Sequence, residues 1–190
     1  PGAASVTAYV RPCYISAVTF VQEGGPVMAK SGKPTASTRA TQALARSGIA
    51  FETLTYDYDP DAGRIGLQAA EAIGEPPRRV LKTLMAEVDG RAVCVVVPSD
   101  HEVSMKKLAQ AFGGKAAVMM RPTDAERITG YHVGGISPFG QKKRVPTAVE
   151  AAAMAEPYVF VNGGQRGLQA KLAPADLVRA LGAVTAPLIA

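Results

Sequence analysis

The segment from residue 130 to residue 144 holds the densest set of groups that could do chemistry. It reads Gly-Tyr-His-Val-Gly-Gly-Ile-Ser-Pro-Phe-Gly-Gln-Lys-Lys-Arg. The paired Gly134 and Gly135 leave their backbone N–H groups unshielded, and such groups can bind a carbonyl or carboxylate oxygen, as an oxyanion hole does. Pro138 stiffens the loop, and the basic run after it could contact phosphates. A plain tight turn with a solvated basic end would give the same pattern, so both interpretations stay open.

A second candidate is Lys82, which lies inside the apolar run Val-Leu-Lys-Thr-Leu-Met. Burying an unpaired ammonium is costly, so we expect this lysine to reach a pocket or an anion. Strand alternation places it on one face with Val80 and Leu84. Tyr56, at the end of the preceding predicted strand, could line the same pocket. The competing interpretations are an outward-facing lysine on a half-exposed strand and simple core packing for the tyrosine.

The charge of the chain is concentrated in one stretch. The formal net charge is +5, and residues 104–144 hold eight basic and two acidic residues. This asymmetry favours one face that binds a polyanion, although an ordinary solvated surface would fit it as well. The basic residues that we expect to contact nucleic acid are Lys142, Lys143, Arg144, Lys106 and Lys107.

Other kinds of site find little support in the sequence. The chain has 190 residues, of which 47% are hydrophobic and 19% charged, so it is too apolar to be disordered. No Gly-x-Ser-x-Gly nucleophile motif or phosphate loop is present. With two cysteines and two histidines, we expect no disulfide scaffold, metal site or cofactor. No apolar run reaches the roughly 18 residues of a membrane helix, so we expect no membrane partner.

The secondary-structure elements that could position these residues are predicted from the spacing of apolar residues and from the positions of turn and capping residues. The pattern predicts helices over 37–47, 65–73, 103–112, 123–128 and 174–181, and strands over 49–56, 80–88, 91–97, 116–120, 158–161 and 168–172. Asp89-Gly90 between two strands is the strongest hairpin signal. Residues 131–146 form an unusually long loop, and long ordered loops are often functional.

The order of these elements predicts the fold class. Strands and helices alternate irregularly, with at least one hairpin, so we expect a mixed α+β sheet rather than a doubly wound parallel one. Residues 35–190 are expected to form one domain. Residues 1–34 lack a sustained period, and we interpret them as an N-terminal extension or a cloning remnant, with room for a partly ordered strand; a secretory signal is only weakly indicated.

The chain resembles the YbaK/EbsC family, free-standing relatives of the editing domain inserted in bacterial prolyl-tRNA synthetases. Leu81-Lys82-Thr83-Leu84 and the glycine loop with its Gln-Lys-Lys continuation carry the resemblance. It runs from about Thr35 to Leu188 and includes Tyr56 and the late Gly-Gly-x-Arg-Gly-Leu turn. It implies a barrel-like mixed sheet flanked by helices.

The resemblance also implies an activity and its residues. It implies a cytoplasmic aminoacyl-tRNA deacylase that removes cysteine from Cys-tRNA(Pro). The implied partners are tRNA and, in addition, prolyl-tRNA synthetase. Lys82 corresponds to the main functional side chain of the family. The glycine loop (Gly134, Gly135, Ile136, Ser137, Pro138) is implied to bind the aminoacyl end, and Tyr56 to line its pocket. The substrate's own thiol is implied to attack the ester and release a cyclic thioester.

Two departures from the family pattern keep other functions open. Tyr58 stands where the family often has His or another polar residue, and Gln169 stands where it often has Asp. A module of the same fold that binds tRNA or a synthetase without hydrolysis is one alternative. A small-molecule hydrolase unrelated to tRNA is another, and the basic segment argues against it.

Overall fold

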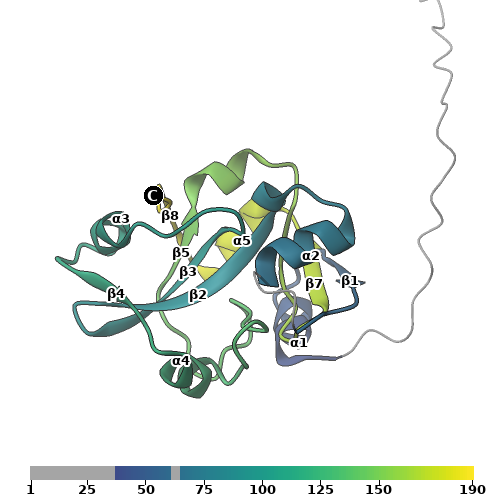
Figure 1. Ribbon diagram of the computed structural model, residues 1–190, viewed down its shortest axis with the longest axis horizontal. Coiled ribbons are helices and arrows are strands. Elements are labelled where there is room, and N and C mark those ends of the chain that lie inside the picture. Colours follow the sequence, from purple (N-terminus) through teal and green to yellow (C-terminus); the bar gives the residue numbers. More distant parts are fainter. Residues whose placement is uncertain (1–36, 61–64) are drawn as a thin grey trace, which may run out of the picture. The chain divides into compact units, whose positions relative to one another are not determined.

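The structure is a computed structural model that describes residues 37–60 and 65–190 (Figure 1). The strands are β1 (Glu52–Thr55), β2 (Val80–Val88), β3 (Arg91–Pro98), β4 (Ala117–Met119), β5 (Thr147–Glu150), β6 (Val159–Asn162), β7 (Leu168–Leu172) and β8 (Val184–Ala186). The α-helices are α1 (Arg39–Arg46), α2 (Ile65–Ile73), α3 (Met105–Ala111), α4 (Pro122–Thr129) and α5 (Pro174–Leu181). Two short 3₁₀ helices, η1 (Pro77–Arg79) and η2 (Ala151–Ala155), complete the set. The predicted N-terminal extension lies outside the described residues.

The eight strands in the described part of the chain join one mixed sheet, which confirms the predicted fold class. The order is β1-β7-β6-β2-β3-β5-β8, with β4 paired to β2 off this path. Pairs β2–β3, β6–β7, β1–β7 and β2–β4 are antiparallel, whereas β2–β6, β3–β5 and β5–β8 are parallel. None of the helices in the described ranges is long and apolar enough to cross a membrane.

The β2–β3 hairpin is the centre of the sheet, and its turn is the one that the sequence predicted. Asp89 and Gly90 have φ values of 47° and 76°, as a type I′ turn requires of both central residues. The strands pair without interruption from Leu81 opposite Pro98 to Val88 opposite Arg91. Because the loop has two residues, the register of every pair in the hairpin is fixed.

The opposite edge of β2 is interrupted. It pairs with β6 only at Val80 and Leu81, and with β4 only from Ala86 to Val88. One further bond, from the Met120 N–H to the Met85 carbonyl at 3.0 Å, extends the β4 side. Between these two partners the sheet is open over residues 82–84, and this opening positions the site described below.

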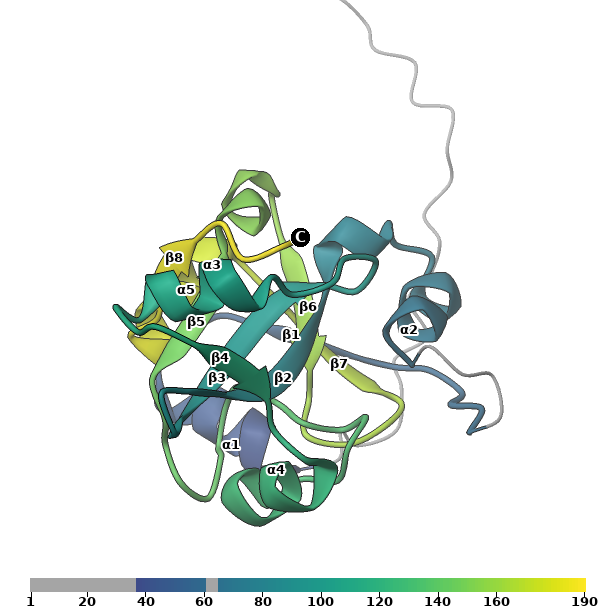
Figure 2. The ribbon, with the colours of Figure 1, turned by 60° about the vertical axis from the view of Figure 1, so that its left-hand side comes forward.

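Helices cover both faces of the sheet. Buried residues of α1, α4 and α5, with Leu44 and Leu177 at 0% exposure, pack on the face that carries Leu81 and Met85 of β2. On the other face, α3 packs against β3, and α2 packs against Val80. Figure 2 shows α3 and α4 on opposite sides of the β2–β3 strands. The alternation of side chains along β2 separates these two cores.

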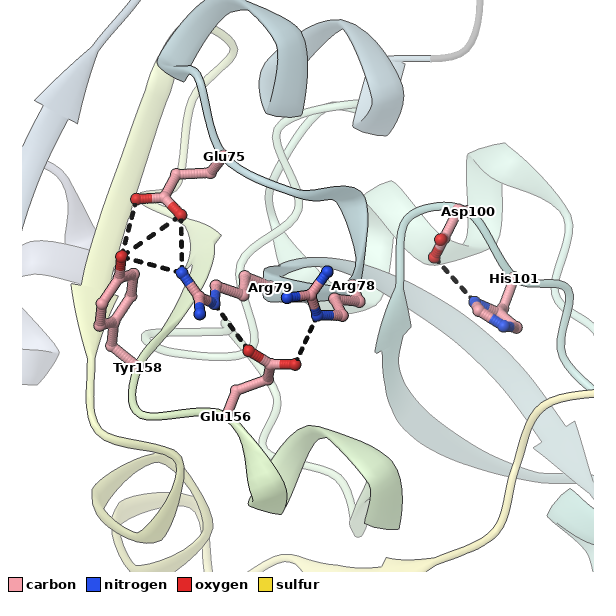
Figure 3. A network of polar contacts seen from close by, with 7 residues as sticks. All are labelled: Glu75, Arg78, Arg79, Asp100, His101, Glu156 and Tyr158. Carbon is pink, nitrogen blue, oxygen red and sulfur yellow. Dashed lines mark hydrogen bonds and ion pairs between the residues drawn. The ribbon is translucent and has the colours of Figure 1, made fainter.

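An ionic network holds the start of β2 beside the start of β6 (Figure 3). Glu156 accepts from Arg78 Nε at 2.8 Å and from Arg79 Nε at 2.6 Å. Arg79 also donates to the hydroxyl of Tyr158, which in turn donates to Glu75. The bond from Arg79 lowers the pKa of Glu156. The network therefore fixes one border of the opening in the sheet.

Most predicted elements are confirmed, and two strands were missed. The helices over 65–73 and 174–181 have the predicted bounds, and Thr38 caps α1 through a capping box. The predicted helix over 103–112 is shorter, because Ser104 caps it and Met105 begins it. Strands β5 and β8 were not predicted. All four residues of β5 are buried, so its sequence shows no alternation, and β8 has only three residues.

Candidate functional site

A cavity of about 760 Å³ lies at the opening in the sheet. Residues 80–85 of β2 form one wall, which places the cavity along the unpaired edge of this strand. The other walls come from α2, the segment after β3 with Ser99, Asp100 and Glu102, the segment from Met119 to Pro122, the glycine loop, and Asn162 and Gln169 at the facing ends of β6 and β7. Strand pairing that stops on both sides of residues 82–84 thus creates the space for a ligand.

Lys82 lines this cavity with its side chain 22% exposed. Its Nζ lies 3.9 Å from Oε1 of Glu102, whose side chain is 90% exposed. An ion pair this exposed and this long is weak, because water competes for both charges. The cation is therefore held at the cavity and remains available to an anionic group of a ligand.

The glycine loop contributes Val133, Gly134 and Ile136 to the cavity wall. Gly134 has φ +87°, which favours glycine because any side chain strains the backbone there, and a Cβ would also lie 2.7 Å from Ile65 Cδ1. The Gly135 N–H instead donates to the His132 carbonyl at 2.9 Å and closes a tight turn. In the described part of the chain, the N–H groups of Gly134 and Ile136 have no acceptor. Among the described loop residues that line the cavity, the amides without an acceptor are therefore those of Gly134 and Ile136, whereas the sequence pattern pairs Gly134 with Gly135.

Asn162 holds this loop against the sheet. Its Nδ2 donates to the Gly134 carbonyl at 3.2 Å, and its Oδ1 accepts from the Gly164 N–H at 2.7 Å. The side chain of Arg166 donates to the Val133 carbonyl as well. The late Gly-Gly turn thus supports the glycine loop from behind, a relation that no local sequence signal indicated.

Three other residues of the predicted site do not line the cavity. Ser137 is fully buried, and its hydroxyl accepts from the Phe139 N–H at 3.2 Å, which stabilises the loop. Pro138 borders a separate cavity of about 240 Å³ between α1 and α5. The Tyr56 hydroxyl is buried without a hydrogen bond among the described residues, and burial raises its pKa, partly offset by the neighbouring Gln169.

The sequence marks Gln169 only as a departure from the family pattern and indicates no role for Thr83. Both line the cavity, with exposed fractions of 4% and 8%. Oε1 of Gln169 and Oγ1 of Thr83 are buried and have no partner in the residues that the structure describes. An unsatisfied buried polar atom costs free energy, so its presence in a cavity wall indicates that a ligand or water completes it. The sequence signal that could have identified Thr83 is its polar side chain on the same strand face as the apolar Leu81 and Met85.

A basic groove of about 760 Å³ lies beside the cavity. Its cationic residues are Arg91, Arg127, Lys142, Lys143 and Arg144, against one acidic residue, Glu87. Met120 lines both hollows, so the basic groove and the cavity share a wall. The structure therefore groups three of the predicted nucleic-acid-binding residues and adds two arginines.

Lys106 and Lys107 do not belong to this groove. They lie on α3, which is on the other side of the β2–β3 strands from α4 (Figure 2). The Lys107 ammonium donates to the Ile189 carbonyl at 2.7 Å and so supports the C-terminal segment. The sequence had grouped all five basic residues because it showed their charges but not their faces.

Protein nucleophiles and metal ligands are sparse around the cavity. In the described ranges, no three His, Cys, Asp or Glu side chains cluster as a metal site would require. Cys94 is fully buried, and burial raises its pKa to about 12. A thiol with this pKa is protonated at neutral pH and cannot act as a nucleophile. The chemical groups that line the cavity are the Lys82 ammonium, the carboxylates of Asp100 and Glu102, neutral side-chain oxygens, and two amides without an acceptor among the described residues.

Comparison with known proteins matches residues 60–180 to the aminoacyl-tRNA editing domain. The chain belongs to the aminoacyl-tRNA editing domain family. This confirms the resemblance to the YbaK/EbsC proteins. The matched range includes the residues that line the cavity, the glycine loop and the basic groove.

Curated relatives of this editing domain include free-standing and inserted forms. EbsC of Enterococcus faecalis, provisionally named a Cys-tRNA(Pro)/Cys-tRNA(Cys) deacylase, is 40% identical over 106 residues, or 55% of this chain and 65% of that protein. A proline–tRNA ligase of Geobacillus thermodenitrificans is 30% identical over 96 residues, or 50% of this chain and 16% of the ligase. The chain thus spans about two thirds of one relative and a small part of the other.

Solved structures agree on the fold. A provisionally assigned trans-editing enzyme for prolyl-tRNA synthetase superposes with a TM-score of 0.69, covering 80% of this chain and 95% of that one at 23% identity. A second structure, of a hypothetical protein, has a TM-score of 0.73 over 80% of this chain and 100% of that one, also at 23% identity. At these identities the superpositions establish the mixed-sheet architecture of the editing domain and nothing finer.

Proposed function

We propose that this editing domain is a trans-acting deacylase that removes cysteine from mischarged Cys-tRNA(Pro). The observation that carries the proposal is the cavity at the opening of β2, where Lys82 and the free amides of Gly134 and Ile136 line one space. Membership of the editing family supplies the class of reaction. The name of the Enterococcus faecalis relative supports cysteine and proline tRNA as the substrate.

The two free amides supply electrostatic stabilisation in this proposal. They donate to the carbonyl oxygen of the aminoacyl ester and stabilise the negative charge that develops there during attack. Ile136 is 7% exposed, so its N–H acts where little water competes. Lys82 binds the phosphate or sugar of the terminal nucleotide and so positions the ester.

The attacking group in this proposal belongs to the substrate. The cysteine thiol sulfur bonds to the ester carbonyl carbon, and the bond from that carbon to the ribose oxygen breaks. The thiol proton passes to the ribose oxygen, so the products are a cyclic thioester and tRNA with a free hydroxyl. Such a route needs no protein nucleophile and gains its rate from proximity. It would discriminate against alanine, which has no thiol.

The basic groove holds the tRNA in this proposal. Its five cations can neutralise backbone phosphates, and its shared wall at Met120 leads to the cavity where the ester reacts. Residues 35–190 act as one editing domain, in the cytoplasm, where tRNA is charged. Prolyl-tRNA synthetase is the proposed partner that would deliver tRNA specificity.

A non-hydrolytic module that binds tRNA or a synthetase remains the second candidate. The observation that favours it is Gln169, a neutral residue where the family often has an acid, in the wall of the cavity. If an acid there were needed for the reaction, this chain would bind without cleaving.

Release of labelled cysteine from Cys-tRNA(Pro) separates the two candidates. We expect release from Cys-tRNA(Pro) and little from Ala-tRNA(Pro) or Pro-tRNA(Pro). The Lys82→Ala protein serves as the control for contaminating esterases. Tight tRNA binding with no release above that control would establish the binding module and overturn the deacylase.

A further inference from the structure

Thr83 is the residue of β2 whose backbone faces the opening in the sheet. In an antiparallel pair, successive residues turn their N–H and C=O groups alternately toward the partner strand and away from it. A two-residue turn makes Val88 and Arg91 a hydrogen-bonded pair, so Leu84 and Lys82 also bond to β3. Thr83 and Met85 then direct their backbone groups away from β3. The bond from the Met120 N–H to the Met85 carbonyl confirms this alternation.

Among the strands of the described residues, none pairs with the backbone of Thr83 on that side. Pairing with β6 ends at Leu81 opposite Val161, and pairing with β4 begins at Ala86 opposite Met119. No other hydrogen bond to the N–H or carbonyl of Thr83 occurs within residues 37–60 and 65–190. A strand in the middle of a sheet therefore presents one unpaired donor and one unpaired acceptor to the cavity.

The side chain of Thr83 strengthens this conclusion. Thr83 is 8% exposed, and its Oγ1 is buried and has no hydrogen-bond partner among the described residues. Three polar groups of one buried residue are thus unsatisfied in the same cavity wall. Native proteins rarely leave such groups unpaired, so the cavity is built for a ligand that carries both donors and an acceptor.

We propose that Thr83 binds the aminoacyl group of the substrate as if it were one residue of an added strand. An aminoacyl ester carries an ammonium and a carbonyl on the two sides of one Cα, as a strand residue carries its N–H and C=O. The ammonium donates to the Thr83 carbonyl, with Oγ1 as a second acceptor, and the ester carbonyl accepts from the Thr83 N–H. The second lone pair of that oxygen remains for the glycine loop.

This inference takes its substrate from the proposed function, and it adds that the site recognises the amino group of the substrate. The site would recognise the α-ammonium common to all amino acids through main-chain groups that no side-chain change removes. A thioester or ester of the same size without an amino group would lack the donor. The charge-assisted bond from an ammonium is among the stronger hydrogen bonds, so its loss should be measurable.

The kinetic test compares two substrates that differ only in the amino group. One is Cys-tRNA(Pro), and the other is tRNA(Pro) carrying 3-mercaptopropionate, prepared by ribozyme-catalysed acylation. Each enzymatic rate is divided by the spontaneous rate of the same ester, because the ammonium also activates the ester. We expect the normalised kcat/KM to fall by about tenfold or more without the amino group, mainly through KM. Equal normalised values would overturn the inference.

A binding test does not depend on turnover. In amide NMR spectra, we expect the Thr83 N–H to exchange with water faster than the ladder N–H groups of Lys82 and Leu84. Cysteine methyl ester should shift the Thr83 resonance saturably, and methyl 3-mercaptopropionate should do so only at about tenfold higher concentration. A slowly exchanging Thr83 amide, or equal affinity for both esters, contradicts the inference.

Variants of Thr83 separate the hydroxyl from the strand. Thr83→Ser keeps Oγ1, and Thr83→Val keeps the shape and the β-branch without it. We expect Thr83→Val to raise KM for Cys-tRNA(Pro) and Thr83→Ser to restore it. A selective NMR response in a protein that cleaves no Cys-tRNA(Pro) would refute the deacylase and support this inference. Cleavage of both esters at equal normalised rates would support the deacylase and refute the role of Thr83 in binding the amino group.

Discussion

The ammonium of Lys82 lies 3.9 Å from the carboxylate of Glu102, on the rim of the cavity. Lys82 is 22% exposed, whereas Glu102 is 90% exposed, so the pair joins a half-buried cation to a solvated anion. Exposed pairs of this kind contribute about 0–1 kcal/mol to stability. A ligand phosphate can therefore replace Glu102 as the partner of Lys82 at little cost.

The first prediction follows from this geometry. Lys82→Ala should remove most deacylase activity and leave the thermal unfolding curve by circular dichroism close to wild type, because a cavity lysine contributes little packing. Glu102→Gln removes only the solvated partner and should retain activity. Turnover of Lys82→Ala close to the wild-type value would exclude Lys82 from the reaction.

The second prediction concerns Gly134. Gly134→Ala adds a methyl group at φ +87°, where any side chain strains the backbone, and places it 2.7 Å from Ile65 Cδ1, so we expect the amide of residue 134 to shift. Loss of one oxyanion donor costs about 2.7–4 kcal/mol in known enzymes, so kcat should fall about a hundredfold or more.

The matched control for this variant is Gly48→Ala. Gly48 also has positive φ, +67°, but nothing lies within 4 Å of a Cβ there. It should lose about 1–2 kcal/mol of stability from backbone strain and keep its activity. If both variants lost the same activity, strain rather than the oxyanion donor would explain the result.

The third prediction separates the two basic regions. The double variant Lys142→Ala, Lys143→Ala should weaken binding of every tRNA alike. It should also lower the slope of log affinity against log salt by about 0.7–0.9 for each phosphate that the protein no longer neutralises. Lys106→Ala, on α3, lies outside the groove and should change neither quantity. Titration of tRNA at several salt concentrations measures both. An unchanged slope for the double variant would make the groove an ordinary solvated surface.

The fourth prediction concerns stability in acid. The bond from Arg79 lowers the pKa of Glu156 below its usual value of 4.5, so the folded state favours the ionised carboxylate. The stabilisation is then complete above the unfolded-state pKa and is lost as the pH falls through the lower folded-state pKa.

Melting temperatures from about pH 7 down to about pH 3 test this sign. Glu156→Gln should melt lower than wild type at neutral pH, and the difference should shrink as the solution becomes acidic. Glu71→Gln, at an exposed position of α2 outside the network, controls for general charge effects. A difference between Glu156→Gln and wild type that grows in acid would contradict the assignment.

Local sequence rules predicted much of the fold and several of the residues that line the cavity. Asp89-Gly90 fixed the central hairpin, and Thr38 marked the start of α1, because turns and caps are decided by neighbouring residues. Strand β5 escaped prediction because its burial comes from elements distant in sequence. For the same reason, no local pattern showed that Ser137 is fully buried or that Pro138 borders a separate cavity.

The sequence by itself determined which chemical groups this editing domain has to offer: a lysine in an apolar strand, an exposed glycine backbone and a basic run. Only the tertiary structure decided which of them are free. It closed a turn with the Gly135 N–H and paired the Lys107 ammonium with the Ile189 carbonyl. Among the described residues, it left the backbone of Thr83 without a partner between the end of β6 pairing and the start of β4 pairing. The physical reason is that a hydrogen-bonding group is available only if no distant part of the chain has paired with it, and strand pairing is a non-local event.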